Sequence, residues 1–311
     1  MKAIVTGGAG FIASHLNDLL LSKGWGVTAV DRIAPESAKN IEHLRDCKSF
    51  DYVCMDITNI EKFVDVSKDA DIIFHLAANS DIQNGGNNPN IDYNDTLLTT
   101  RSVLESMRIN KIGKLFFSST SAVYGMKTNM ALNEKTGDLR PISYYGAAKL
   151  ASESLISAYS YMCSFDALIF RFPNVVGPRL THGVIFDFVK KLNDNPDTLT
   201  ILGNGKQNKE YVYVIDLVKG IVNFIDKPLS GVNIFNISTE SSVNVDTIAD
   251  IICEKMKLPD VKYEYTGGNC GWKGDVPSFD YDISKAKSAG WEYDHDSIKA
   301  IEKTVEAVLK I

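Results

Sequence analysis

The sequence predicts an α/β fold: a doubly wound parallel sheet with a smaller C-terminal domain interleaved with it. Up to about Phe172, short apolar runs alternate with amphipathic helical stretches. These runs are continuously apolar, which is typical of strands that helices cover on both faces. After Pro173 the elements become shorter, and loops rich in glycine, asparagine and proline separate them. This change in character indicates a second domain.

The first element is a strand at residues 2–6 that leads through a glycine turn into an amphipathic helix ending near Lys23. Gly7 and Gly10 permit a tight turn and let the backbone approach a pyrophosphate closely. The amides and the dipole at the start of the helix would bind its negative charge. Ala13 supplies the small residue that lets helix and strand pack. Together these features predict a Rossmann-type dinucleotide-binding unit.

The next strand, at residues 27–30, ends on Asp31 at the spacing expected for a ribose ligand. A carboxylate there accepts a hydrogen bond from the ribose 2′-hydroxyl and repels a 2′-phosphate, so we predict NAD as the cofactor in preference to NADP. Arg32 follows directly, and an arginine beside the carboxylate can serve a phosphate instead. The simpler alternative for Asp31 is a carboxylate that only caps a turn.

Three more strands are predicted at residues 71–77, 114–119 and 165–171. Their apolar runs are bounded by polar or turn-forming residues. Two later segments, 211–214 and 232–236, are candidates for a return to the same sheet.

We therefore place the Rossmann-type domain at residues 1–172, with return elements from about 211–238. The smaller, substrate-binding domain occupies mainly residues 173–311. The stretch 79–90, rich in asparagine and glycine, is predicted to be a loop beside the site.

Tyr145 and Lys149 are spaced one helical turn apart and so share a helix face. A free phenol has a pKa of about 10, so a tyrosine that acts as a base needs a cation and a hydrogen-bonding neighbour. A lysine ammonium close by would favour the phenolate. Without other context the same spacing is typical of a half-buried aromatic beside a solvated lysine.

Composition excludes several classes of function. The chain has 311 residues and a formal net charge of -6, which gives no basic surface for nucleic acid. The first strand begins at residue 2 and no apolar stretch approaches bilayer length, so we expect no membrane association and a cytoplasmic protein. The five cysteines and five histidines are scattered, and we expect no metal site.

Two further motifs complete an ordered set, at residues 118–125 (SSTSAVYG) and 171–178 (RFPNVVGP). With the glycine turn, Asp31 and the Tyr145/Lys149 pair, they resemble the extended short-chain dehydrogenase/reductase family. Within it, the chain is most similar to the NAD-dependent nucleotide-sugar epimerases of the UDP-glucose 4-epimerase type.

The resemblance implies a role for each matching position. Tyr145, Lys149 and Thr120 would be catalytic; Lys149 would also hold the nicotinamide ribose, and Thr120 would hydrogen-bond the reacting sugar hydroxyl. The other implied NAD contacts are Gly7, Gly10, Phe11 and Ile12 at the pyrophosphate, Asp31 with Arg32 at the ribose, Asp56 and Ile57 at adenine, and Leu76, Ala77 and Ala78 on the nicotinamide side. The implied nucleotide-sugar contacts are Asn174, Lys209, Trp272, Lys273, Asp275 and Phe279.

The implied reaction is epimerisation at C4 of a UDP-sugar, such as UDP-glucose and UDP-galactose. Tyr145 would remove the C4 hydroxyl proton while hydride passes to NAD, and the 4-keto sugar would take hydride back on its other face. Related 4,6-dehydratases carry an Asp-Glu pair after the equivalent of Thr120. Here Ser121 and Ala122 follow it, which favours epimerisation because elimination lacks its acid and base.

The chain departs from the family pattern at three positions. Lys209 and Trp272 stand where arginines commonly clamp the substrate diphosphate, and a lysine cannot grip a phosphate bidentately. Thr96 stands where the family usually has an asparagine near the cofactor. These changes alter the expected site without removing it.

Other readings stay open at this point. The chain could be a related NAD-dependent nucleotide-sugar dehydrogenase or reductase, a 4-epimerase of a UDP-hexuronate, or a non-catalytic NAD-sensing scaffold.

Helices around residues 96–107 and 145–162 resemble the pair that forms the family's homodimer contact, so we expect a homodimer. The resemblance also implies that Phe279 lines the sugar pocket and restricts it against 2-acetamido sugars; the simpler alternative is that Phe279 only packs the lid.

Overall fold

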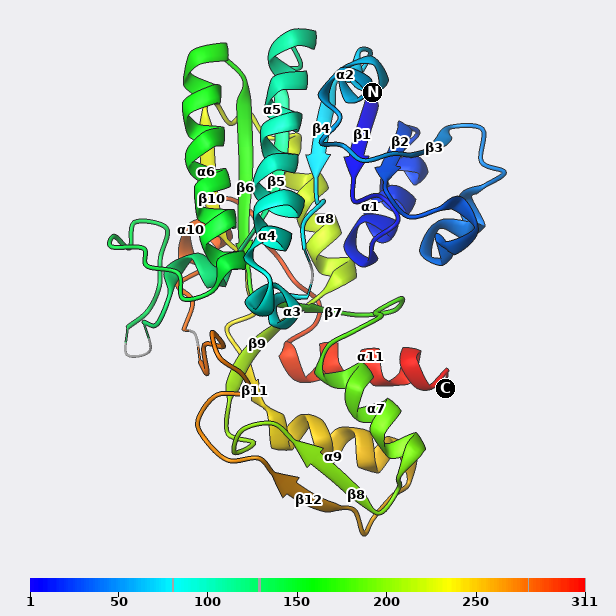
Figure 1. The fold of residues 1–311 in the computed structure, drawn as a ribbon, viewed down its shortest axis with the longest axis vertical. Helices are drawn as coiled ribbons and strands as arrows, with labels where there is room; N and C mark the ends of the chain where they lie inside the picture. The colour runs from blue at the N-terminus through cyan, green and yellow to red at the C-terminus, as the bar shows by residue number, and fades with distance from the viewer. Residues whose placement is uncertain (80, 128–129, 279, 311) are drawn as a thin grey trace. The chain divides into compact units, whose positions relative to one another are not determined.

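The computed structural model describes residues 1–79, 81–127, 130–278 and 280–310. The chain forms two compact units that are interleaved in sequence, and Figure 1 traces the chain through both. Unit 1 comprises Met1–Gly125, Gly137–Arg171 and Val218–Phe235, and unit 2 comprises Met126–Thr136, Phe172–Leu217 and Asn236–Ile311. The functional division drawn from the sequence at residue 172 stays a prediction.

Unit 1 is built on a seven-stranded sheet with the strand order β10-β6-β5-β4-β1-β2-β3. The pairs β1–β2, β1–β4, β2–β3 and β4–β5 are all parallel. The strands are β1 (Lys2–Thr6), β2 (Gly26–Asp31), β3 (Phe50–Cys54), β4 (Ile72–His75), β5 (Lys114–Thr120), β6 (Asp166–Phe172) and β10 (Val232–Asn236).

This strand order confirms the predicted doubly wound fold. The chain winds outward from β1 in one direction through β2 and β3, and in the other through β4, β5 and β6. Ligands of such sheets bind beyond the carboxyl ends of the strands where the direction reverses. The switch point here lies between β1 and β4, whose ends are paired at Thr6 and His75.

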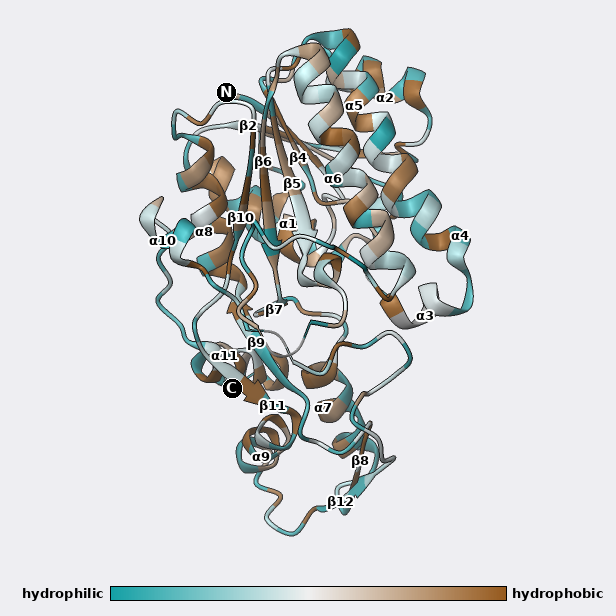
Figure 2. Ribbon diagram, turned by 90° about the vertical axis from the view of Figure 1, so that its left-hand side faces the viewer, coloured by the Kyte–Doolittle hydropathy of each residue, from teal (hydrophilic) through white to brown (hydrophobic). Residues whose placement is uncertain are grey.

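Helices cover both faces of the sheet. Figure 2 shows α2, α5 and α6 on one side and α8 on the other. The first group packs on the sheet through a buried cluster that includes Phe63, Leu104, Phe117 and Ile156. No helix within the described ranges is both long and apolar enough to cross a membrane. The helices are α1 (Phe11–Ser22), α2 (Ile60–Ser67), α5 (Thr99–Asn110), α6 (Tyr144–Cys163) and α8 (Val214–Ile225), the last of which begins in unit 2.

The prediction of a loop at residues 79–90 is wrong for most of that stretch. It contains helix α3 (Ile82–Asn87) and the start of α4 (Pro89–Asp92), and a π-helical turn, Tyr93–Leu98, then leads into α5. Gly85 allows this packing, because a Cβ atom there would lie 2.3 Å from the Asp92 Oδ2 atom.

Unit 2 has its own sheets and core. β9 pairs in parallel with β7 and antiparallel to β11, and β8 pairs in parallel with β12. A buried cluster joins these strands to α7, α9 and α11. The elements are β7 (Asn174–Val176), β8 (Thr198–Ile201), β9 (Asn208–Tyr213), β11 (Ser242–Asn244), β12 (Lys262–Tyr265), α7 (Val184–Asp194), α9 (Val245–Met256), α10 (Ser284–Ser288) and α11 (Ser297–Leu309).

The two segments predicted to return to the main sheet, 211–214 and 232–236, lie in different sheets. β10 is an edge strand of the seven-stranded sheet, as predicted, whereas β9 lies between β7 and β11. The prediction for residues 211–214 is therefore wrong. A short apolar run fits any sheet that offers it an edge, and β7, which follows β6 almost directly, offers that edge.

Candidate active site

The glycine turn lies at the switch point and has the shape of a phosphate cradle. Gly7 has a φ of +65°, and a Cβ atom there would lie 2.9 Å from the backbone of Ala77. Helix α1 begins at Phe11, and no described side chain caps its N-terminus. The first amides, including those of Phe11 and Ile12, have no acceptors within the helix. The cradle and these amides fit a dinucleotide pyrophosphate.

Asp31 ends β2 beside this turn, and its carboxylate is fixed from two sides. Its Oδ2 atom accepts a hydrogen bond of 3.1 Å from the Ala9 amide, and its Oδ1 atom accepts one of 3.2 Å from the Ile33 amide. The side chain thus does cap a turn, as the simpler alternative held. Its role at a ribose stays a prediction.

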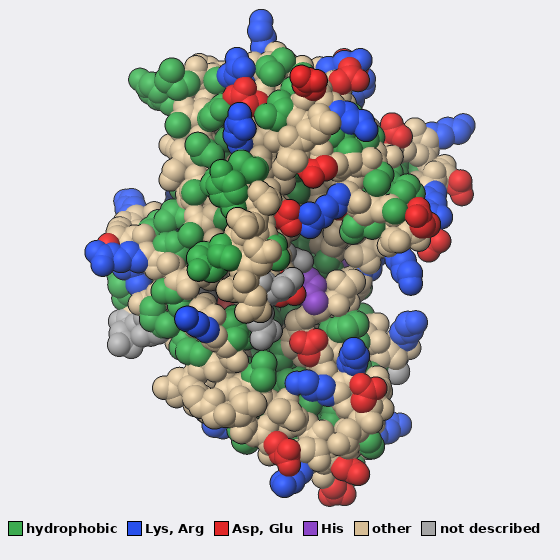
Figure 3. Space-filling view, in the orientation of Figure 1, with side chains coloured by type: hydrophobic (Ala, Val, Ile, Leu, Met, Phe, Trp, Pro, Cys, Tyr) green, Lys and Arg blue, Asp and Glu red, His purple; other side chains and the backbone are tan. Residues whose placement is uncertain are grey.

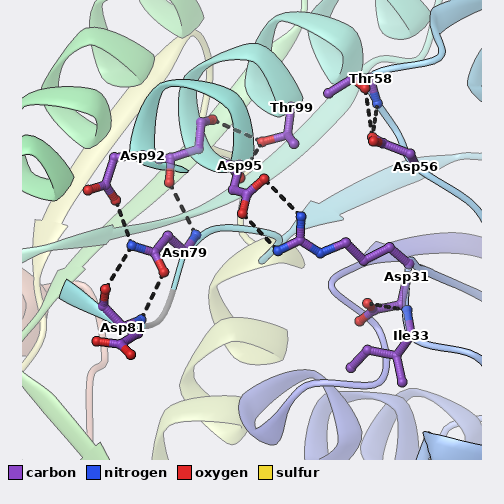
Figure 4. A network of polar contacts seen from close by, with 11 residues as sticks. Asp31, Ile33, Asp56, Thr58, Asn79, Asp81, Asp92, Asp95 and Thr99 are labelled. Atoms are coloured by element: carbon purple, nitrogen blue, oxygen red, sulfur yellow. Dashed lines mark hydrogen bonds and ion pairs between the residues drawn. The ribbon is translucent and has the colours of Figure 1, made fainter. Parts of the chain in front are cut away.

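Arg32 has a protein partner. Its guanidinium donates hydrogen bonds of 2.9 and 2.7 Å to the two carboxylate oxygens of Asp95, as Figure 4 shows. This hydrogen-bonded carboxylate raises the pKa of Arg32 above its usual value.

The two residues implied at adenine, Asp56 and Ile57, differ in exposure. Asp56 is exposed, and its Oδ1 atom accepts hydrogen bonds from the amide and the hydroxyl of Thr58, at 2.8 and 2.7 Å. The side chain of Ile57 is 5% exposed and belongs to the core beneath the sheet.

The segment after β4 runs against the glycine turn. Leu76, Ala77 and Ala78 are half-buried, and the Ala77 amide donates to the hydroxyl of Thr6 at 3.3 Å. Thr96, in the π-helical turn, is fully buried and its hydroxyl accepts from the Asn79 amide at 3.3 Å. Thr96 therefore supports this segment through its side chain.

His75, at the end of β4, is a packed residue and is neutral. Its ring nitrogens lie 2.7 Å from the Thr6 hydroxyl and 3.0 Å from that of Thr100. Because the Thr100 hydroxyl donates to the Thr96 carbonyl, it accepts from Nε2–H of the histidine. Complete burial, with the nearby charge of Lys149, lowers the pKa of His75 to about 3. Such a histidine binds β1, β4 and α5 together.

Tyr145, Lys149 and Thr120 lie together in unit 1. Thr120 ends β5, and the other two residues occupy the first turns of α6, where the Ser143 side chain accepts from the Gly146 amide. The Lys149 Nζ atom donates to the Ser118 carbonyl at 2.6 Å and lies 5.9 Å from the centre of the Tyr145 ring. The Thr120 side chain lowers the pKa of Tyr145, against the effect of burial. Tyr145 therefore has a threonine that acts on its pKa and a nearby amine.

The electrostatics of this group differ from the expectation that Lys149 favours the phenolate. Desolvation raises the pKa of Tyr145 to about 12, aided by the negative charge of Asp92 and opposed by the hydrogen bond with Thr120. Burial also disfavours the charged form of Lys149 and lowers its pKa to about 7. The lysine is itself desolvated and engaged with a carbonyl, so in this state the phenol remains protonated at neutral pH.

Sequence reasoning missed two buried acids near this group. Glu153 stands one turn beyond Lys149 on α6, so the helical spacing could have identified it. Its carboxylate pairs with Arg171 at 3.0 and 2.6 Å. Asp92 is 1% exposed, and its Oδ2 atom has no hydrogen-bonding partner among the described residues. Only the fold brings Asp92 close, because nothing in the sequence relates α4 to α6.

Tyr124 lies in the short helical turn Ser121–Tyr124 that follows β5. It is fully buried, and its hydroxyl accepts a hydrogen bond of 3.0 Å from the Arg171 guanidinium. Packing is the role that the structure supports.

In unit 2 the structure brings together three of the implied sugar-nucleotide residues. The Lys209 Nζ atom pairs with Asp275 Oδ1 at 2.5 Å and lies 5.1 Å from the centre of the Trp272 ring. The Trp272 Nε1 atom is buried and has no partner within the described ranges. Lys273 and Asn174 are exposed. Phe279 lies outside the described residues.

The fold and these groups define a dinucleotide-dependent enzyme of the Rossmann type. Residues 3–238 match the model of the NAD dependent epimerase/dehydratase family. The chain therefore belongs to that family, and the predictions of an NAD cofactor and of an enzyme of the nucleotide-sugar epimerase type are confirmed at the level of the family.

Solved structures agree with this assignment. A UDP-galactose 4-epimerase is 32% identical, with a TM-score of 0.88, over 100% of this chain and 99% of the other. The UDP-glucose 4-epimerase of Thermotoga maritima, solved with UDP-glucose, is 27% identical with a TM-score of 0.89. The UDP-glucuronic acid 4-epimerase of Bacillus cereus, solved with UDP-glucuronic acid and NAD, has the same two values. The last two alignments each cover 100% of this chain and 99% of the other.

Proposed function

We propose that this chain epimerises C4 of a nucleotide sugar, with UDP-glucose and UDP-galactose as the interconverted pair. The observation that carries the proposal is the position of Tyr145: the Lys149 Nζ atom lies 5.9 Å from the centre of its ring, and the Thr120 side chain lowers its pKa. The similar 4-epimerases of UDP-galactose and UDP-glucose support the choice of sugar.

In the proposed mechanism Tyr145 takes the proton of the C4 hydroxyl, and Thr120 orients that hydroxyl. The chemistry that bound NAD supplies is acceptance of a hydride from C4 and its return to the other face. Because the pKa of Tyr145 is about 12 in this state, the phenol needs added positive charge before it becomes a base. Lys149, whose pKa is about 7, can exchange a proton near neutral pH. It would hold the nicotinamide ribose as well.

The glycine turn, Asp31 and the segment 76–78 would hold NAD, and Lys209, Trp272 and Asp275 would hold the sugar nucleotide. In this proposal Trp272 stacks on a flat part of the ligand while Lys209 faces the diphosphate. Lys209 would have to leave part of its pairing with Asp275 to do so. Asn174 and Lys273 are proposed to contribute polar contacts.

The principal test is incubation with UDP-glucose, UDP-galactose, UDP-glucuronate and the UDP-N-acetylhexosamines, with products resolved by NMR and NADH followed by absorbance. Interconversion of the glucose and galactose forms without net NADH is the expected result. Release of a keto product with stoichiometric NADH would identify a dehydrogenase, and complete absence of turnover with retained NAD binding would identify a scaffold. Faster turnover of UDP-glucuronate would move the assignment to the hexuronate, which the likeness to the Bacillus cereus enzyme makes the second candidate.

Phe279 is proposed to limit space beside C2 of the sugar. If so, the glucose and galactose pair turns over faster than the N-acetylated pair, and Phe279→Ser narrows the difference. Equal or higher kcat/KM for the N-acetylated pair in the unmodified enzyme would contradict this role.

A homodimer is proposed through helices α5 and α6. Hydrophobic side chains gather over these helices in Figure 3, and Ile109, Tyr161 and Met162 are 47%, 88% and 78% exposed. Light scattering at micromolar concentration should give the mass of two chains, and the mass of one chain would contradict the proposal. The cytoplasmic location also stays a prediction.

A further inference from the structure

Arg32 and Asp95 come from opposite sides of the switch point of the sheet. Arg32 follows β2, whereas Asp95 lies in the π-helical turn whose Thr96 bonds the segment after β4. In the sheet β1, with its glycine turn, stands between β4 and β2. The Arg32–Asp95 pair therefore joins the two sides of the switch point, where a dinucleotide binds.

The contact between the two side chains is a fork. Two nitrogens of Arg32 meet two oxygens of Asp95 at 2.9 and 2.7 Å. The arginine side chain is 66% exposed and the aspartate 21%, so water and ligands can reach the guanidinium from one side. A bidentate pair fixes the direction of the guanidinium as well as its distance. An exposed arginine without such a partner would be free to turn toward other anions.

Asp31, the neighbour of Arg32, is already held by the glycine turn through the Ala9 amide. The 2′ position of an adenosine ribose therefore meets a fixed carboxylate, and the only cation adjacent to it in sequence is occupied elsewhere. A 2′-phosphate would face repulsion from Asp31 with no compensating charge.

We propose that Asp95 is a cofactor-specificity residue: by holding Arg32 in the fork, it keeps the guanidinium from serving a 2′-phosphate and so enforces NAD over NADP. The proposal rests on NAD binding at this crevice and is independent of which sugar is epimerised. It assigns the preference to two residues acting in opposite ways. Asp31 repels the 2′-phosphate of NADP, and Asp95 keeps the Arg32 guanidinium paired so that it does not bind this phosphate.

Substitution of Asp95 should not unfold the turn. The hydrogen bond that the Thr99 hydroxyl donates goes to the backbone carbonyl of Asp95, so it survives a change of side chain. Asp95→Asn keeps the shape and removes the charge, and Asp95→Ser removes the fork entirely. Either variant frees Arg32.

The experiment measures Kd for NAD and NADP by competition against the fluorescence of bound NADH, using the full chain. Asp95→Asn and Asp95→Ser are expected to bind NADP about tenfold more tightly than the unmodified protein, with NAD affinity changed less than about twofold. Arg32→Met alone should leave NADP affinity nearly unchanged, because the arginine is already held. Combined with Asp95→Asn, it should abolish the gain. Glu105→Gln is the matched control, since Glu105 pairs with the exposed Arg108 on α5, and it should alter neither affinity.

Three results would overturn the proposal. The first is unchanged NADP affinity in both Asp95 variants, with melting temperatures like that of the unmodified protein. The second is a gain that persists after Arg32 is removed. The third is weaker NADP binding in Arg32→Met alone, which would show that the arginine serves the phosphate despite its partner. Loss of sugar turnover with the expected cofactor affinities would leave this inference standing and contradict only the proposed function.

Discussion

Each unit contains a paired cation near its candidate ligand site, and the two pairs are built differently. In unit 1 the Arg171 guanidinium meets both oxygens of Glu153, and a third nitrogen donates to Tyr124. The Ser119 hydroxyl donates to the same carboxylate at 2.5 Å. In unit 2, Lys209 meets Asp275 through one oxygen.

The unit 1 pair is fixed, whereas the unit 2 pair can open. The side chains of Arg171 and Glu153 are 4% and 5% exposed. Each of the three guanidinium nitrogens of Arg171 donates a hydrogen bond. A lysine ammonium is a point charge that can leave one oxygen for another anion. Asp275 retains a hydrogen bond from the Gly271 amide on its other oxygen. We therefore expect the unit 1 pair to act in stability and the unit 2 pair to act in ligand binding.

The largest effect is expected in unit 1, at Tyr145. Tyr145→Phe should keep the fold and NAD binding but lower kcat about 10²- to 10⁴-fold, because the ring remains while the proton acceptor is lost. Thr120→Ala should cause a smaller loss. Tyr144→Phe is the matched control, because Tyr144 is the neighbouring tyrosine and is 51% exposed. Ordinary turnover by the Tyr145→Phe protein would remove Tyr145 from the mechanism.

The next effect tests the fixed pair itself. Glu153→Gln leaves the Arg171 charge buried without its carboxylate, which should lower the free energy of unfolding by about 3–5 kcal/mol. Asp65→Asn, which breaks the exposed Lys68–Asp65 pair of α2, should change it by less than about 1 kcal/mol. Urea titrations of both variants provide the measurement. Similar small losses in the two would mean that the buried pair is no stronger than a surface one.

Unit 2 should show a pH dependence that comes from Glu210, on β9. Burial raises the pKa of this carboxyl to about 7, against hydrogen bonds from Ser238 and the Tyr281 amide. The folded state therefore retains the proton where the unfolded chain releases it. The contribution to stability is full below about pH 4.5 and is lost as the pH rises through about 7, by up to about 3 kcal/mol.

Glu210→Gln should remove this part of the pH dependence, as measured by thermal melts from pH 4 to about pH 8. Near pH 8 the variant should match or exceed the stability of the unmodified protein. Parallel pH profiles for the two proteins would show that Glu210 has an ordinary pKa in the fold.

The smallest effect is expected when the lysine of the unit 2 pair is replaced by an arginine, the cation of the unit 1 pair. Lys209→Arg should lower KM for the UDP-sugar about three- to tenfold with little change in kcat, because a guanidinium grips a phosphate bidentately. Asp275 keeps a cationic partner, so stability should stay within about 1 kcal/mol of the unmodified protein. An unchanged KM would place Lys209 away from the diphosphate.

The features that the sequence determined by itself are local. The strand, glycine turn and helix at the N-terminus depend on residues within a few positions of one another, and so does the spacing that puts Tyr145 and Lys149 on one face of α6. Asp31 could be placed because it ends the next strand. Periodicity and turn chemistry act over such distances, and they sufficed for the doubly wound class of fold.

Other features depend on contacts between segments that are distant in the sequence. Arg32 pairs with a residue 63 positions away, β9 joins β7 instead of the main sheet, and helix α3 lies where a loop was expected. The pKa of Tyr145 moves upward because the fold removes water from the phenol and brings Asp92 near it. Each outcome depends on contacts between distant segments or on desolvation, and neither is encoded in the spacing of neighbouring residues.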